Sequence, residues 1–113
     1  MDCLFCKIIA GEIPSAKVYE DEYCFAFKDI NPQTPVHVLV VPKKHAARVV
    51  DLAEEDTYLL GHIQLVIGKL AEELGVKESG FRVMTNYGDD ACQSVKHLHY
   101  HLLGGAQMSE KMV

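Results

Sequence analysis

The sequence predicts a single α+β domain in which about five strands form a mostly antiparallel sheet and one long helix packs on it. Short strand-like segments come first along the chain, one long helical segment follows, and two further strand-like segments come last. This order, with short connections, is typical of domains whose helix covers one face of an antiparallel sheet. A length of 113 residues supports one hydrophobic core, so we expect one domain over residues 1–113.

The first third of the chain predicts a short helix followed by three strands. Residues 4–10 have a helical pattern that ends at Gly11. Residues 18–20 and 24–27 have strand-like patterns separated by an acidic turn, which predicts a hairpin. A loop with two prolines follows, and residues 36–41 then form the clearest early strand.

The middle and the end of the chain predict one long helix and two more strands. Apolar residues recur three and four positions apart at Leu59, Ile63, Val66, Leu70 and Leu74. This spacing places them on one face of an α-helix, and Gly75 then provides a stop. Residues 81–85 and 95–103 are predicted as the last two strands, the second ended by two glycines.

Composition indicates a soluble globular protein and excludes several function classes. Apolar residues make up 49% of the chain, charged residues 24%, and the net charge is −5. A binder of nucleic acid needs a basic face, and a membrane span needs about 20 apolar residues in a row, so we expect neither partner. The start of the chain lacks a basic region followed by an apolar stretch, so we expect a cytoplasmic protein whose four cysteines stay reduced.

Three histidines at alternate positions carry the clearest chemical signal. His97, His99 and His101 fall on a predicted strand, where alternate side chains share a face and adjacent rings stand about 7 Å apart. Two such rings can bracket a phosphate, so that one attacks phosphorus while the next donates a proton. The alternative is a solvated sheet face or a fortuitous metal chelator, which the strict spacing disfavours. The residues that alternate with the rings are expected to face the helix: Leu98, Tyr100 and Leu102.

The segment 93–105 has the sequence QSVKHLHYHLLGG, which resembles the His-x-His-x-His motif of the histidine triad (HIT) family. Three further segments resemble the Hint branch of that family: residues 5–14, FCKIIAGEIP; residues 27–32, FKDINP; and residues 35–45, PVHVLVVPKKH. The resemblance covers nearly the whole chain. It implies the HIT-like fold, and a homodimer joined through the long helix and a strand so that two sheets become continuous.

The resemblance also implies a reaction and the residues that perform it. Hint-like proteins are purine nucleotidyl hydrolases or transferases that act on nucleoside phosphoramidates and related adducts. By position, His99 would form a covalent nucleotidyl-histidine intermediate, from which water releases a monophosphate such as AMP or GMP. His101 would contact the phosphate and help to protonate the leaving group, beside His97 at the start of the row. His37 matches an upstream histidine that lies against the triad.

The same resemblance gives a set of nucleotide-binding residues. Asp29 would bind the ribose hydroxyls, because a carboxylate can accept from two vicinal hydroxyls. The full expected set is Leu4, Phe5, Ile8, Phe27, Lys28, Asp29, Ile30, Leu39, Asn86, Gln93, Ser94, Val95, His99 and His101. The alternatives are ordinary core for the apolar members, and turn roles for Asp29 and Asn86.

Cys3 and Cys6 have the spacing of metal ligands. In histidine triad proteins that keep this pair, two histidines complete a zinc site, and the matching residues here are His45 and His97. A closed site of two cysteines and two histidines would be structural. The alternative is a pair of reduced thiols, and a redox role is disfavoured because no βαβ pattern follows. We expect no organic cofactor.

Two other functions stay open from the sequence. The histidine row could be a catalytic metal triad that activates a zinc-bound water. The protein could also be a nucleotide-binding scaffold with little activity.

Overall fold

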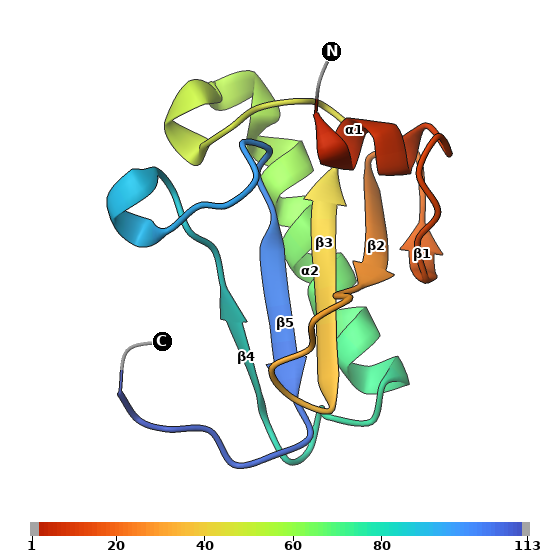
Figure 1. Cartoon of the computed structure of the whole chain (residues 1–113), viewed down its shortest axis with the longest axis vertical. Coiled ribbons are helices and arrows are strands. Elements are labelled where there is room, and N and C mark those ends of the chain that lie inside the picture. Colours follow the sequence, from red (N-terminus) through yellow and green to blue (C-terminus); the bar gives the residue numbers. More distant parts are fainter. Residues whose placement is uncertain (1–2, 112–113) are drawn as a thin grey trace.

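The computed structural model describes residues 3–111, which fold into a five-stranded antiparallel sheet with one long and one short helix (Figure 1). The elements are α1 (Leu4–Ile9), β1 (Lys17–Glu20), β2 (Cys24–Lys28), β3 (Val36–Pro42), α2 (Thr57–Glu73), β4 (Phe81–Met84) and β5 (Tyr100–Gly104), with 3₁₀ turns at Val49–Asp51, Glu54–Asp56 and Asp89–Ala91. The strand order is β1-β2-β3-β5-β4, and every pairing is antiparallel. The predicted fold class is confirmed.

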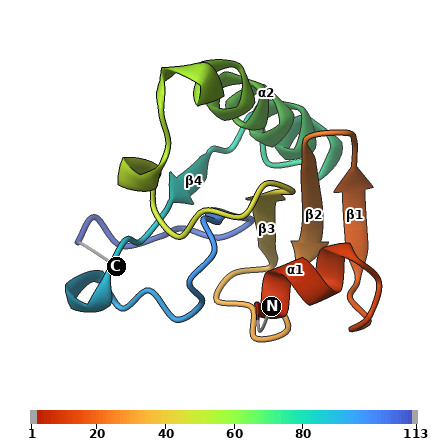
Figure 2. The ribbon, with the colours of Figure 1, turned by 90° about the horizontal axis from the view of Figure 1, so that it is seen from above.

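The sheet separates two hydrophobic clusters. Figure 2 shows α2 on one side of the sheet and α1 on the other. Because alternate residues of a strand face opposite sides, Val38 and Val40 of β3 pack in the cluster with α2, whereas Leu39 and Val41 pack in the cluster with α1. Because α1 has only six residues, it covers only part of its face of the sheet, and the candidate site lies on that face.

The buried face of α2 matches the predicted apolar stripe. Ile63, Val66 and Leu70 are buried against the sheet, and Leu59 and Leu74 are partly buried at the two ends. Truncating a fully buried leucine such as Leu70 to alanine costs about 2–5 kcal/mol of stability, so this stripe holds the helix in place. None of the helices within residues 3–111 is long and apolar enough to cross a bilayer.

The prediction of a last strand over residues 95–103 is wrong at its start, because β5 begins only at Tyr100. The chain bends at residues 95–97, and the backbone N–H of Leu98 donates to the carbonyl of Ala46 at 2.7 Å instead of joining the β3 ladder. Of the three histidines, only His101 therefore lies within a strand. Leu98, Tyr100 and Leu102 are still buried in the α2 cluster, as predicted.

Candidate active site

His99 and His101 lie side by side where the chain enters β5. In the strand register, His101 stands between Leu39 of β3 and Met84 of β4, on the sheet face away from α2. The ring centroids of His99 and His101 are 5.2 Å apart, and those of His99 and Phe5 of α1 are 5.0 Å apart with the two rings nearly perpendicular. The two rings are close enough to act on one phosphate group.

The hydrogen bond made by His99 defines which ring nitrogen is available. Its Nδ1 lies 2.7 Å from the carbonyl oxygen of His97, so Nδ1 carries the proton and donates. The lone pair is then on Nε2. Burial lowers the pKa of His99, against the opposing effects of the His97 carbonyl and Asp29, so the ring is neutral at pH 7. A neutral imidazole with a free Nε2 is a nucleophile.

A chain of hydrogen bonds defines the tautomer of His101 in the same way. The backbone N–H of Gln33 donates to Nδ1 of His37 at 3.0 Å, so His37 carries its proton on Nε2. This Nε2 donates to Nδ1 of His101 at 2.9 Å, which leaves the proton of His101 on its own Nε2. Burial, with His99 and His37 nearby, lowers the pKa of His101 to about 4. His101 is therefore a neutral hydrogen-bond donor beside His99.

A cavity of about 340 Å³ opens beside the two rings and is called here the His99 cavity. Its lining residues are Leu4, Phe5, Ile8, Ile13, Pro14, Phe27, Asp29, Ile30, Leu39, Ser94, Val95, His99 and His101. The structure thus brings together most of the expected nucleotide-binding set. Ile13 and Pro14 were missed, although they lie a few residues after the short helix that supplies the first three lining residues.

Asp29 combines a turn role with a position at the cavity. Its Oδ1 accepts from the backbone N–H of Asn31 at 2.8 Å, which is the local turn contact proposed as the alternative. Its Oδ2 lies 3.4 Å from Nε2 of His37, and the residue lines the His99 cavity. The two interpretations of Asp29 are therefore compatible, since each uses a different oxygen.

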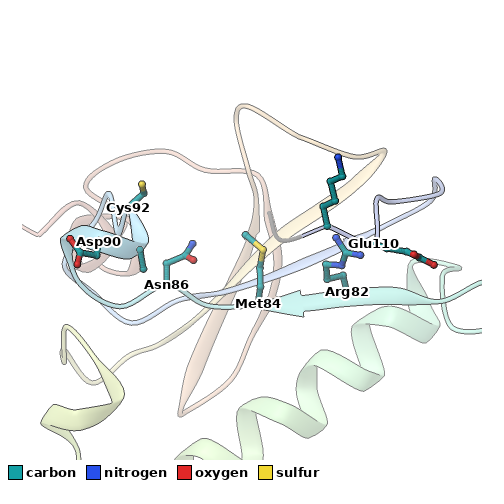
Figure 3. Close-up of a pocket in the computed structure, with 8 residues that line it drawn as sticks. Arg82, Met84, Asn86, Asp90, Cys92 and Glu110 are labelled. Carbon is teal, nitrogen blue, oxygen red and sulfur yellow. The ribbon is translucent and has the colours of Figure 1, made fainter.

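Three expected nucleotide-binding residues do not line the His99 cavity. The side chain of Gln93 is buried and bridges two loops, accepting from the N–H of Gly88 at 2.9 Å and donating to the carbonyl of Ala47 at 2.6 Å. Asn86 lies in a separate open groove near Cys92, as Figure 3 shows. Lys28 lines a smaller depression of about 210 Å³ on the other side of Asp29.

Four thiol and imidazole groups converge beneath α1. Nδ1 of His97 lies 3.3 Å from Sγ of Cys3, 3.6 Å from Sγ of Cys6 and 3.2 Å from Nδ1 of His45. In a tetrahedral zinc site, ligand atoms are separated by about 3.3 Å between two nitrogens and about 3.6 Å between nitrogen and sulfur. Nε2 of His97 donates to the carbonyl of Pro42 at 2.8 Å, which directs the Nδ1 lone pair into the cluster. The ligand atoms of the four residues lie close to the separations of a zinc site, and His97 has the tautomer that a zinc ion requires.

The histidine row does not form one group of metal ligands. Among residues 3–111, His97 clusters with the two cysteines and His45, while His101 clusters with Asp29 and His37. His99 belongs to neither group. This division disfavours a catalytic ion held by all three row histidines.

A second cavity, of about 350 Å³, lies on the β4 side of His101 and is called here the Arg82 cavity. Its lining residues are Gln33, Thr34, His37, Arg82, Met84, His101, Leu103, Met108 and Ser109. The sequence analysis missed Arg82 and Met84, although alternation along the predicted strand 81–85 places both on one face. No motif marked that face as part of the site.

Comparison with known proteins agrees with this architecture. A model of the HIT domain family matches residues 10–108. An uncharacterized HIT-like protein of Synechocystis is 49% identical over 108 residues, which cover 96% of this chain and 94% of the relative. The chain belongs to the HIT family.

Solved structures extend the comparison to the fold. A HIT family hydrolase from Legionella pneumophila superimposes with a TM-score of 0.94 at 47% identity, over 96% of this chain and 97% of that chain. A histidine triad nucleotide-binding protein from Candida albicans gives a TM-score of 0.82 at 35% identity, over 99% and 87% of the two chains. The protein has the fold of the HIT family hydrolases.

Proposed function

We propose that this protein is a purine nucleotidyl hydrolase or transferase that cleaves nucleoside phosphoramidates and related adducts through a covalent intermediate on His99. The observation that carries the proposal is the pairing of two complementary tautomers. His99 offers a lone pair on Nε2, and the neighbouring His101 offers a proton on Nε2. A nucleophile and a hydrogen-bond donor at the mouth of one cavity suit displacement at phosphorus.

The reaction takes two steps. In the first, Nε2 of His99 forms a bond to phosphorus, the P–N bond breaks, and the leaving nitrogen takes up one proton from solvent and departs as an amine. In the second, water attacks phosphorus, the bond to His99 breaks, one proton returns to solvent and the nucleoside monophosphate is released. In both steps His101 donates a hydrogen bond to the phosphate oxygens, on which negative charge is concentrated.

The His99 cavity supports a nucleoside as the group that is retained. Its apolar lining suits a planar base, and Oδ2 of Asp29 suits the ribose hydroxyls. The Candida relative at 35% identity is described as nucleotide-binding, which is consistent with this assignment. We take AMP and GMP as the first ligands to test, since apolar contacts do not select between adenine and guanine.

We further propose that Cys3, Cys6, His45 and His97 hold a structural zinc ion. When bound, the ion would crosslink α1 to the segment before β5 and would leave no coordination position open to water. Phe5 lies next to Cys6 on α1 and packs against His99, so this crosslink would hold one wall of the His99 cavity in place.

A homodimer is proposed on the evidence of exposed apolar residues along β4 and α2. β4 is an edge strand with exposed Phe81 and Val83, and α2 exposes Tyr58 and Leu65. An unpaired strand edge is a template for pairing with a second copy. Light scattering at two concentrations should give the mass of a dimer, and a monomer mass at both would contradict the proposal.

The function is tested by trapping the intermediate. The protein is mixed with adenosine 5′-phosphorofluoridate, whose fluoride leaves without a proton, and intact mass is measured within seconds. The wild type should gain the mass of an adenylyl group, and peptide mapping should place it on His99. His99→Ala should remain folded and gain nothing, while His62→Gln, altered at a histidine that lines neither cavity, should react like the wild type.

Two results would contradict the proposal. Turnover that persists in His99→Ala would exclude this nucleophile. Calorimetric binding of AMP without adduct or turnover on a broad substrate panel would instead favour a nucleotide-binding scaffold.

A further inference from the structure

We propose that Thr85 is a positioning residue for the proposed reaction, because its hydroxyl holds the backbone of His99 in the place from which the ring attacks phosphorus. Thr85 lines neither the His99 cavity nor the Arg82 cavity. It acts on the main chain of the proposed nucleophile through one hydrogen bond to the His99 carbonyl. This inference rests on the proposed function and adds to it a side chain that fixes the attacking group.

The backbone of His99 is not held by the sheet. β5 begins at Tyr100, so the residues of β5 have main-chain partners in β3 or β4. Within residues 3–111, His99 has no strand partner. His99 is nevertheless buried, and buried main-chain groups need hydrogen-bond partners. The position of His99 therefore depends on contacts other than the strand ladders.

Three hydrogen bonds hold His99 and its neighbours instead. The N–H of Leu98 donates to the carbonyl of Ala46 at 2.7 Å. The ring of His99 donates from Nδ1 to the carbonyl of His97 at 2.7 Å. The hydroxyl of Thr85 donates to the carbonyl of His99 at 2.7 Å. The carbonyls of Ala46 and His97 belong to the main chain, which every amino acid supplies. Thr85 therefore provides the one contact in this set that depends on the identity of a residue other than His99.

The strand register explains why Thr85 reaches this carbonyl. Figure 1 shows β4 running beside β5 in the opposite direction, and Met84 of β4 is paired with His101 of β5. Thr85 follows Met84, and in an antiparallel pair the next residue toward the start of β5 is Tyr100. His99 comes one residue earlier, where the ladder has ended. The hydroxyl of Thr85 thus continues the attachment of β5 to β4 by one residue, from a side chain.

Loss of this hydroxyl should displace the ring of His99. Among residues 3–111, the carbonyl of His99 has no other hydrogen-bond donor. An unsatisfied buried carbonyl costs free energy, so the peptide group after His99 should turn toward another donor. That rotation moves the ring relative to His101, and a misplacement of about 1 Å is enough to slow a displacement reaction. Nucleotide affinity should persist, because it depends on cavity walls that do not include Thr85.

The test measures how fast the adduct on His99 forms with adenosine 5′-phosphorofluoridate in single turnovers. Thr85→Val removes the hydroxyl and keeps the shape of the side chain. We expect its maximum rate to fall about three- to tenfold, which corresponds to the loss of one hydrogen bond. Thr85→Ser keeps the hydroxyl and should restore most of the rate. In both variants the reagent concentration that gives half the maximum rate, and the calorimetric Kd for AMP, should stay within about twofold of the wild type.

Thr57→Val is the matched control. The hydroxyl of Thr57 also donates to a backbone carbonyl, that of Glu54 at 2.6 Å, but it lies at the start of α2 and lines neither cavity. This variant should form the adduct at the wild-type rate. Thr85→Ala compared with Thr85→Ser isolates the Thr85 hydroxyl a second time, so the comparison can be made even if the valine variant does not fold.

A purely structural role for Thr85 would overturn the inference. In that case Tm would fall in Thr85→Val while the maximum rate per folded molecule stayed at the wild-type value. Equal rates in Thr85→Ser and Thr85→Ala would overturn it as well. Both results leave the proposed function intact, because the wild type still forms the adduct. Absence of the adduct in the wild type overturns the proposed function and this inference together.

Discussion

Nε2 of His37 lies 2.9 Å from Nδ1 of His101, and this contact determines which nitrogen of His101 carries the proton. The backbone N–H of Gln33 donates to Nδ1 of His37, so the main chain sets the direction of this chain of hydrogen bonds. A proton on Nε2 of His101 is thereby maintained by a residue that does not line the His99 cavity.

His37→Ala should reduce turnover without weakening nucleotide binding. Without the donor at His37, His101 distributes its proton between both ring nitrogens and donates less effectively, which we expect to lower kcat by about 10- to 100-fold. Steady-state kinetics give kcat, and calorimetry with AMP should give a nearly unchanged Kd. A large loss of AMP affinity with kcat preserved would assign His37 to binding instead.

Formation of the His99 adduct should persist in weakly acidic solution. Burial lowers the pKa of His99 below the ordinary value of about 6.5, so the nucleophile stays neutral until the pH falls through that depressed pKa. With the phosphorofluoridate as substrate, the rate should be flat from pH 8 to below pH 6.5 and should fall only in more acidic solution. The rate of adduct formation is measured at each pH by rapid acid quenching followed by intact-mass analysis. A midpoint above pH 6.5 would contradict it.

Removal of zinc should weaken the fold without abolishing the chemistry. Chelation, or His45→Ala, should lower Tm by several degrees because the crosslink between α1 and the segment before β5 is lost. Elemental analysis should find one zinc ion per chain in the wild type and much less in the variant. The adduct on His99 should still form. If chelation abolished it and zinc restored it, the zinc-dependent hydrolase would be the better hypothesis.

Asp21 should stabilise the protein at neutral pH and lose this effect in acid. Burial raises the pKa of Asp21, but hydrogen bonds from His62, Tyr19 and the backbone N–H groups of Tyr23 and Cys24 outweigh it and hold the pKa well below its usual range. The stabilisation is therefore complete above the unfolded value of about 3.9 and declines as the pH falls toward the folded pKa.

Asp21→Asn should accordingly lower the free energy of unfolding by about 1–3 kcal/mol at pH 7, with a smaller difference below pH 4. Urea unfolding at several pH values measures both quantities. Asp90→Asn, at an exposed carboxylate, is the control and should have little effect at any pH. A difference between wild type and Asp21→Asn that grows in acid would refute this assignment.

The elements that follow a simple repeat were predictable from the sequence. The apolar stripe through Ile63 and Leu70 defines α2, and the alternation through Leu98 and Leu102 correctly places those residues against it. The bend before β5 was not predictable by the same means. It depends on a backbone hydrogen bond between Leu98 and Ala46, far apart in the chain, and backbone partners of this kind leave no pattern in side-chain identity.

The candidate site likewise contains residues that could be predicted from the sequence and residues that could not. The His99 cavity is lined by residues from segments that resemble known motifs, so Asp29 and Ser94 could be named in advance. Arg82 was missed because its relation to His101 depends on β4 pairing with β5, and strand order is not encoded locally. Gln93 was assigned to the ligand because of its place in a motif, whereas its amide bridges Gly88 and Ala47.

The acceptor that orients His99 is the carbonyl of His97, which belongs to the main chain. Every amino acid supplies that carbonyl, so the orientation of the His99 ring does not require histidine at position 97. The imidazole of His97 instead contacts the thiol of Cys3 in the cluster under α1. Relatives could exchange that ring for another side chain, and so give up the cluster, while the orientation of the His99 ring is kept.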